Sequence, residues 1–386
     1  MLALVLTGCG ATPPPLIIVS DESTDLPLRG ATGAQVDRFT AGDRQFDEVY
    51  RQADGLGPVF IRAQCSACHQ GAARGPGFVV KMSLSGDAGT ELMYGHTERP
   101  RGIGGATPLL APKAVGVVMS QRSSPAVFGR GYLEAIADSE IEAVEASQLA
   151  GGVVSGRINR VRYESEPNPD SLFHAHQLGE SNLIGRFGLK ARIATLDEFS
   201  ADALQGDMGM TSPLRPVELP NPDGWADDSK TGVDVPLYVV NELADYMRLL
   251  EIPARRVNDS SAEATFASLG CAACHVPAMK TRADYPIAAL AGIDAKVYSD
   301  LLLHDMGPAF SDGLIDGDAQ PSEWKTAPLI GLRHLISYLH DGRADSVEQA
   351  IVLHGADRSE ARASVEAYLA LPGAERLRVL SFISSL

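Results

Sequence analysis

The chain has 386 residues, 45% of them hydrophobic, which is enough to bury the cores of two lobes. Its formal charge is −16, from 33 basic and 49 acidic residues. This balance argues against nucleic acid as a partner, because phosphates call for clustered Lys and Arg, and it favours basic partners.

The N-terminal sequence MLALVLTGCG places Cys9 directly after a short apolar run. The segment LTGC at residues 6–9 resembles the lipobox of bacterial lipoproteins, in which the cysteine carries lipid. The alternative is a truncated ordinary signal peptide, since no positively charged segment precedes the run. We expect residues 1–9 to be a lipoprotein signal and residues 10–33 a tether. The body would then be periplasmic or in the cell envelope, and lipid would be its membrane contact.

Helical periodicity predicts helices at residues 44–53, 133–150, 235–250 and 373–386. Residues 71–130 are rich in Gly, Pro and Arg, which indicates loop structure. Residues 213–232 are rich in Pro, Asp and Gly and are the best candidate for a linker between lobes. Alternating strand patterns are nearly absent. The predicted fold is therefore mainly α, with long loops.

Four of the five cysteines lie in two copies of one pattern, QCSACHQG at 64–71 and GCAACHVP at 270–277. Local disulfides would leave the adjacent histidines unexplained, and the gap between the pairs is far outside zinc-site spacing. Covalent c-type haem accounts for every residue, because two thiols bind the vinyl groups and the histidine ligates iron. We expect two covalently bound c-type haems, attached through Cys65, Cys68, Cys271 and Cys274, with His69 and His275 as proximal ligands.

The two motifs divide the chain into two expected lobes, each similar to a cytochrome c. The N-terminal haem lobe would cover residues 34–212 and the C-terminal haem lobe residues 233–386. The linker at 213–232 would join them.

Seven segments occur in an order that resembles the di-haem c-type oxidoreductase family, whose members are labelled thiol oxidoreductases or peroxidases. They are GLGPVFIRAQCSACH, SGRINRV, GRFGLKA, GDMGMTSP, DLLLHDMGP, EWKTAPLIGL and LHDGRADSVEQAIVLHG. The last segment also resembles bacterial di-haem cytochrome c peroxidase and the di-haem enzyme that matures the quinone cofactor of methylamine dehydrogenase. The resemblance implies that one haem meets peroxide while the other holds and passes electrons.

The second haem needs a sixth ligand if it transfers electrons. Ser346 and Gln349 form a capping-box pattern, which predicts a helix through residues 347–355 with His354 in its last turn. His354 stands where the peroxidases have their axial methionine, so the resemblance implies that it is the ligand. Met306, in HDMGP, is the alternative, because Met before Gly-Pro resembles the axial loop of small cytochromes c. His354 could also merely interact with the helix dipole.

The first haem has no evident distal ligand, so we expect it to be the reactive centre. The segment RSSPAVFGRGYLEAI resembles the one that supplies the peroxide pocket of the peroxidases. This implies Glu134 as the acid–base group and Arg122 as the residue that polarises the departing oxygen. Glu134 could instead be an ordinary helix carboxylate. We expect His96 to be a solvent-facing loop residue.

Other polar residues are expected to support the haems. His304 and His340 would lie at the haem edge, with Asp305 fixing a tautomer or contacting a propionate. Relatives pass electrons through a tryptophan, but Leu189 stands at that place here, so Trp324 or a direct edge-to-edge route would substitute. The segment SDGLIDGD offers oxygen ligands for calcium, although an Asp-Gly turn is the simpler description; the ligands would be Asp312, Asp316 and Asp318.

Two classes of function remain open from the sequence. The first is an exported, peroxidase-like di-haem oxidoreductase that takes electrons from a small cytochrome c or cupredoxin and reduces a peroxide-like oxidant. The second is a di-haem electron-transfer cytochrome without a substrate of its own. An open first haem favours the enzyme, whereas six-coordinate iron at both sites favours the relay.

Overall fold

The computed structural model describes residues 24–73, 75, 77–84, 92–225 and 230–386. Helices dominate its regular structure, as predicted, and long loops join them. The helices are α1 (Gly33–Asp47), α2 (Arg130–Ala135), α3 (Asp138–Gly151), α4 (Leu196–Met208), α5 (Leu237–Leu249), α6 (Ser260–Ser268), α7 (Val347–Leu353), α8 (Arg362–Ala370) and α9 (Gly373–Ser385). Among the described residues, no helix combines the length and apolar character needed to cross a membrane.

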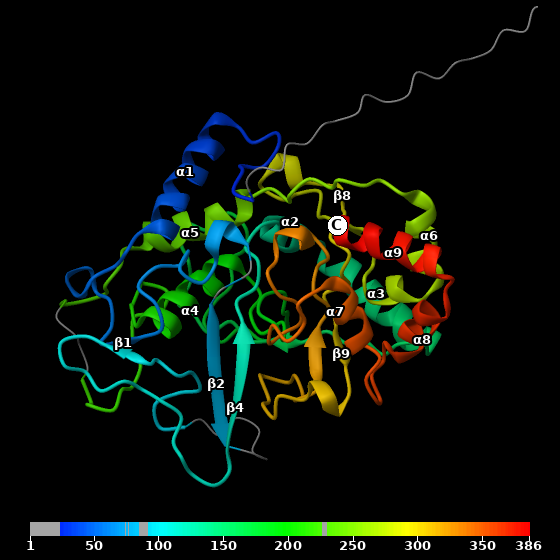
Figure 1. The fold of residues 1–386 in the computed structure, drawn as a ribbon. Coiled ribbons are helices and arrows are strands. Elements are labelled where there is room, and N and C mark those ends of the chain that lie inside the picture. The colour runs from blue at the N-terminus through cyan, green and yellow to red at the C-terminus, as the bar shows by residue number, and fades with distance from the viewer. Residues whose placement is uncertain (1–23, 74, 76, 85–91, 226–229) are drawn as a thin grey trace, which may run out of the picture.

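The strands pair two by two in short antiparallel ladders. They are β1 (Val59–Phe60), β2 (Phe78–Leu84), β3 (Arg101–Gly102), β4 (Val117–Ser123), β5 (Arg160–Val161), β6 (Leu183–Ile184), β7 (Met279–Lys280), β8 (Asp294–Ala295), β9 (Leu303–Asp305) and β10 (Glu323–Lys325). The β2–β4 ladder is the longest and lies between two groups of helices (Figure 1). The loop prediction for residues 71–130 is wrong there, because these strands pair across a long segment without a tight-turn signal.

Helix α1 begins well before the predicted start at residue 44. Thr32 caps it, since its hydroxyl accepts a hydrogen bond from the Gln35 backbone N–H and the Gln35 side chain accepts one from the Thr32 backbone N–H. The residues before the cap are packed too. Leu28 is buried, and its N–H donates to the Leu249 carbonyl at 2.6 Å. The described part of the predicted tether therefore belongs to the folded body.

The predicted helix at 133–150 is split into α2 and α3. At the break, the Ala137 N–H donates to the Lys280 carbonyl at 3.0 Å, and Ile136 pairs with Thr281. These backbone groups are satisfied by a distant strand, so the helix need not continue through them. The predictions at 235–250 and 373–386 are confirmed by α5 and α9.

Among the described residues, the two largest of four clusters of buried hydrophobic residues form most of the core. In the first, α1 and α5 approach closely, since a Cβ on Gly42 would lie 2.1 Å from the Glu242 carbonyl oxygen. The second cluster is centred on Phe266, Tyr298 and Phe382, whose rings meet edge to face. Helix α5, which follows the predicted linker at residues 213–232, packs with α1 and α4, and the first cluster also takes up later residues such as Met279 and Ile330 (Figure 1).

Helix α3, from the N-terminal half of the chain, contacts the C-terminal half. It precedes the linker in sequence, yet Gln148 donates through Nε2 to the Ala273 carbonyl and to Asp300, both at 2.8 Å. Ala273 lies inside the second cysteine motif. The second motif is therefore fixed in part by a helix from the N-terminal half of the chain.

Candidate haem-binding site

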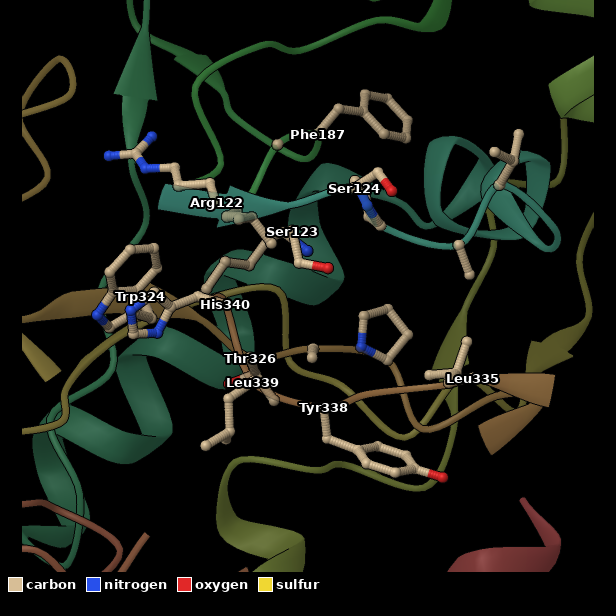
Figure 2. A pocket seen from close by; sticks show the side chains of 18 of the residues that line it. Arg122, Ser123, Ser124, Phe187, Trp324, Thr326, Leu335, Tyr338, Leu339 and His340 are labelled. Carbon is tan, nitrogen blue, oxygen red and sulfur yellow. The ribbon is translucent and has the colours of Figure 1, made fainter. Parts of the chain in front are cut away.

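One cavity of about 490 Å³ is lined by both cysteine motifs. Residues from α4, α5, β2, β4, β10 and α7 complete its wall. The structure thus brings together the six residues that the sequence assigns to haem attachment, namely Cys65, Cys68, His69, Cys271, Cys274 and His275. Figure 2 shows part of this cavity, with Trp324 and His340 close together near Arg122.

The first motif is folded as a tight turn that orients its histidine. The His69 backbone N–H donates to the Cys65 carbonyl at 3.1 Å, and the His69 Nδ1 lies 2.8 Å from the Pro125 carbonyl oxygen. A carbonyl oxygen only accepts, so Nδ1 carries the proton and Nε2 keeps its lone pair. Burial lowers the pKa of His69 to about 4, which keeps the ring neutral at neutral pH. A neutral imidazole with a free Nε2 is what iron requires.

The second motif repeats this arrangement with different partners. The His275 N–H donates to the Cys271 carbonyl at 2.9 Å, and Nδ1 lies 3.0 Å from the Tyr298 carbonyl oxygen. Burial lowers the pKa of His275 to about 4, and the neighbouring His354 contributes to the shift. Metal-ligating histidines generally donate their second ring N–H to such an acceptor. The donor set at both motifs therefore fits c-type haem.

His354 lies in the cavity beside the second motif. The Ser346 hydroxyl caps α7 by accepting from the Gln349 N–H at 3.1 Å, as predicted, and α7 ends at Leu353, directly before His354. The His354 Nδ1 lies 2.6 Å from the Ala350 carbonyl oxygen, so this ring too keeps Nε2 as its lone-pair nitrogen. Burial lowers its pKa.

Met306, the rival ligand, also lines the cavity. Its sulfur lies 4.0 Å from the Ser359 hydroxyl oxygen, which is a weak contact that leaves the thioether able to reach a ligand. The structure therefore places both candidates in the cavity. His354 has the bond pattern of the two proximal histidines, whereas Met306 has no such orienting contact among the described residues.

His304 does not have the properties of an iron ligand. Its Nε2 lies 2.9 Å from Asp300 and its Nδ1 lies 2.9 Å from Glu360. Burial lowers the pKa of His304, but these hydrogen bonds outweigh it and raise the pKa to about 12. The ring is then an imidazolium without a lone pair. Its partners are Asp300 and Glu360 and not the predicted Asp305.

Glu134 occupies a position that does not suit the predicted acid–base role. It is buried outside the cavity lining, and Arg248 holds it through two contacts of 2.7 and 3.1 Å. The Tyr285 hydroxyl and the Leu196 N–H also donate to its carboxylate. Burial raises the pKa of Glu134, but Arg248 outweighs burial and the net shift is downward. Glu134 is thus a fixed anion in an ion pair.

Arg122 lines the cavity, but its guanidinium is already paired. It contacts Asp312 at 2.9 Å and Asp316 at 2.7 Å, and Lys190 approaches Asp312 at 3.5 Å. The calcium hypothesis for residues 311–318 does not fit this arrangement, because cations of the protein neutralise two of the three proposed ligands. The simpler turn is present, since Asp316 and Ala319 exchange backbone hydrogen bonds.

Trp324 is packed between polar groups at the cavity wall. The His340 ring stacks on it with centroids 3.7 Å apart, and the Lys190 Nζ lies 4.2 Å from the indole centroid (Figure 2). The indole N–H donates to the Phe310 carbonyl at 2.9 Å. Leu189 also lines the cavity, whereas Trp225 packs in a separate small cluster. His96 is exposed, as predicted.

Asp207 is a cavity residue that the sequence reasoning missed. It lines the cavity near Cys65 and Cys68, and its charge interacts with Lys81 and Arg192. Within the described part of the chain, its carboxylate has no hydrogen bond or ion pair, and burial raises its pKa. The only available signal was its place in the segment GDMGMTSP, which the family resemblance had already singled out.

One comparison with known proteins identifies a family for this chain. A family model described as "Di-haem oxidoreductase, putative peroxidase" matches residues 111–386. No curated protein matches the chain. Among solved structures, hydrazine synthase of Kuenenia stuttgartiensis, pressurised with xenon, is similar over 100% of this chain and 99% of its own, at 13% identity and a TM-score of 0.40. Since the family model covers most of the sequence, the chain belongs to the di-haem oxidoreductase family.

Proposed function

We propose that this protein is an exported, peroxidase-like di-haem c-type oxidoreductase with two cytochrome c-like haem sites. The first haem would be the reactive centre and the second would store and pass electrons. The observation that carries the proposal is the matched pair of histidines, His69 and His275, which face one cavity with Nδ1 bound to a backbone carbonyl. Covalent attachment would use the four motif cysteines.

The surroundings of the two sites support different roles. Apolar side chains such as Phe266, Ile351 and Val365 line the cavity near the second motif, where His354 can close the coordination of iron. Closed coordination suits electron transfer. Near the first motif the lining contains Lys81, Asp207 and other charged residues. A polar wall suits a site where protons move and a polar substrate binds.

A bound haem supplies one-electron exchange at its iron, so two haems match the two electrons that peroxide reduction consumes. The protein must also move protons, because reduction of hydrogen peroxide to two waters consumes two of them. Asp207, which lines the cavity, would accept a proton from one peroxide oxygen and deliver it to the other. Arg192 would help to hold negative charge near the breaking bond, although Asp202 pairs with it.

The electron donor would be a small cytochrome c or cupredoxin. The formal charge of −16 would attract a donor with a basic face. We also propose that the protein acts in the periplasm and is anchored through Cys9, which lies outside the described residues. Incorporation of labelled fatty acid into the wild type, and its loss in Cys9→Ser, would be expected; an unlabelled wild type would contradict the anchor.

The proposed function is tested by haem content and peroxide turnover together. Protein expressed with the haem-maturation machinery should keep two haems after denaturation, and replacing both cysteines of one motif by Ala (Cys65 with Cys68, or Cys271 with Cys274) should remove one. The loaded wild type should consume hydrogen peroxide with a reduced small redox protein as donor. A mass without two haem increments would contradict the cofactor assignment. Loaded protein without turnover would favour the electron-transfer cytochrome.

A further inference from the structure

Lys325 is a cavity cation that the proposed mechanism does not use. It ends β10 and lines the cavity. Its charge interacts with Arg130, which also affects His69, and with Asp300, which also affects His275. Lys325 therefore lines the same cavity as both motif histidines and interacts with charges that also affect them.

The ammonium group of Lys325 has no partner within the described residues. Its backbone N–H donates to the Leu189 carbonyl at 3.0 Å, but its side chain makes no hydrogen bond or ion pair there. The acidic group with which the Lys325 charge interacts is Asp300. The Asp300 carboxylate, however, already accepts from His304, Gln148 and the Leu302 N–H at 2.8–3.0 Å.

Other cations that line the cavity differ from Lys325 in this respect. Arg122 is held by two aspartates and Arg192 by Asp202, while the Lys81 ammonium donates to the Thr97 hydroxyl at 2.7 Å. These side chains have their charge or their donors satisfied by the protein itself. The Lys325 ammonium is thus available to bind a ligand that enters the cavity.

The chemistry of that ligand follows from the site. Lys325 is partly buried, where an ammonium without an anion is unfavourable, and desolvation together with Arg130 lowers its pKa to about 7. A carboxylate would restore the charge and satisfy the ammonium donors. Each haem carries two propionate carboxylates on the part of its rim away from the vinyl groups. The four motif cysteines and Lys325 line the same cavity, so a propionate is a carboxylate that bound haem would bring into it.

We propose that Lys325 binds a carboxylate in the cavity that both motifs line, and that this carboxylate is a haem propionate. The inference rests on the proposed function, since it requires bound haem. Oxidised haem carries one more positive charge than reduced haem, so a nearby cation destabilises the oxidised form and favours the reduced haem. Lys325 would thereby raise the midpoint potential of the haem it contacts.

The test compares Lys325→Gln with Lys325→Arg, which keeps the charge, and with Lys296→Gln, which removes a charge from an exposed position. Midpoint potentials of the two-haem protein are measured by spectroelectrochemistry, and propionate modes by resonance Raman spectroscopy. We expect Lys325→Gln to lower one potential and shift one propionate mode, whereas Lys325→Arg and Lys296→Gln leave both near wild type. Unchanged potentials and modes in a loaded Lys325→Gln protein would overturn the proposal.

Two further results separate the alternatives. If Lys325 binds a free anion instead, added acetate will shift the wild-type potential and leave Lys325→Gln unaffected, and the propionate assignment falls. If Lys325→Gln fails to load haem, a crystal structure of the loaded wild type decides, because the Lys325 Nζ must lie within about 3.5 Å of a propionate oxygen. Absence of haem from the wild type would instead contradict the proposed function itself.

Discussion

At the scale of single residues, Glu134 and Asp207 differ in whether their carboxylates already have hydrogen-bond partners. Glu134 accepts four hydrogen bonds and is fixed by Arg248, so it cannot exchange a proton without breaking a buried ion pair. Asp207 has no hydrogen bond or ion pair to its carboxylate among the described residues, and it lines the cavity. Chemical availability therefore points to Asp207 and away from Glu134.

We expect Asp207→Asn to slow peroxide turnover by a factor of about 10² to 10⁴, which is typical for removal of a general acid–base group. The amide has nearly the same shape but cannot carry the proton. Stopped-flow measurements with one electron donor throughout would measure the change, and haem content should stay at the wild-type level. Ser200→Ala, another cavity position, is the matched control and should have little effect. Equal rates for wild type and Asp207→Asn would remove Asp207 from the mechanism.

Arg248 should matter for stability. Arg248→Met would leave the Glu134 carboxylate buried without its cation, and such changes cost about 3–5 kcal/mol in the free energy of unfolding. Urea titration of the haem-loaded protein would measure it. Arg378→Met removes an exposed partner of Asp259 and should cost far less. If Arg248→Met lowered the free energy of unfolding only slightly, the ion pair would contribute little to stability.

The same pair predicts how stability depends on pH. The folded-state pKa of Glu134 is lowered, so its contribution is present above the carboxyl pKa of the unfolded chain and is lost as pH falls through the folded-state value. Wild type should therefore lose stability at acidic pH more steeply than Arg248→Met.

At the scale of elements, α7 presents His354 to the cavity. Its Ser346 cap and the contact from His354 to Ala350 fix the end of the helix and the orientation of the ring. The capping residues could be recognised in the sequence because they act within one turn. Ligation itself stays a prediction, since Met306 also reaches the cavity.

We expect His354→Met to raise the midpoint potential of the second haem, because a thioether stabilises ferrous iron better than an imidazole does. The variant should also gain the near-infrared charge-transfer band of Met-ligated ferric haem. Met306→Ala is the matched control and should leave potential and spectrum unchanged. A wild type that already shows this band and loses it in Met306→Ala would identify Met306 as the ligand.

The sequence could predict those features of the elements that depend on neighbouring residues, but not those that depend on remote partners. The cap of α7 and the periodicity of α5 and α9 are local, and the structure has all three. The partners of β2 and Glu134 are remote, with Arg248 lying 114 residues after Glu134. No pattern in one segment records a partner at that distance. The assignment of Glu134 from family resemblance therefore missed the ion pair that occupies it.

At the scale of the whole molecule, the two haem motifs line one cavity. Helix α5 returns to the first core, and α3 contributes Gln148 to the second motif. These exchanges make the relative position of the motifs a property of the entire fold. The predicted linker at 213–232 contains no helix or strand among its described residues, and its role as a boundary between lobes stays a prediction.

This shared cavity is the basis of the central claim that the two haems have different coordination. The most direct measurement is the EPR and near-infrared spectrum of the fully ferric, haem-loaded wild type, before and after addition of cyanide. The account predicts one low-spin haem that has two histidine ligands and does not bind cyanide. The other haem should have an open coordination position and bind cyanide. Two six-coordinate haems that both exclude cyanide would contradict the account and favour an electron-transfer cytochrome.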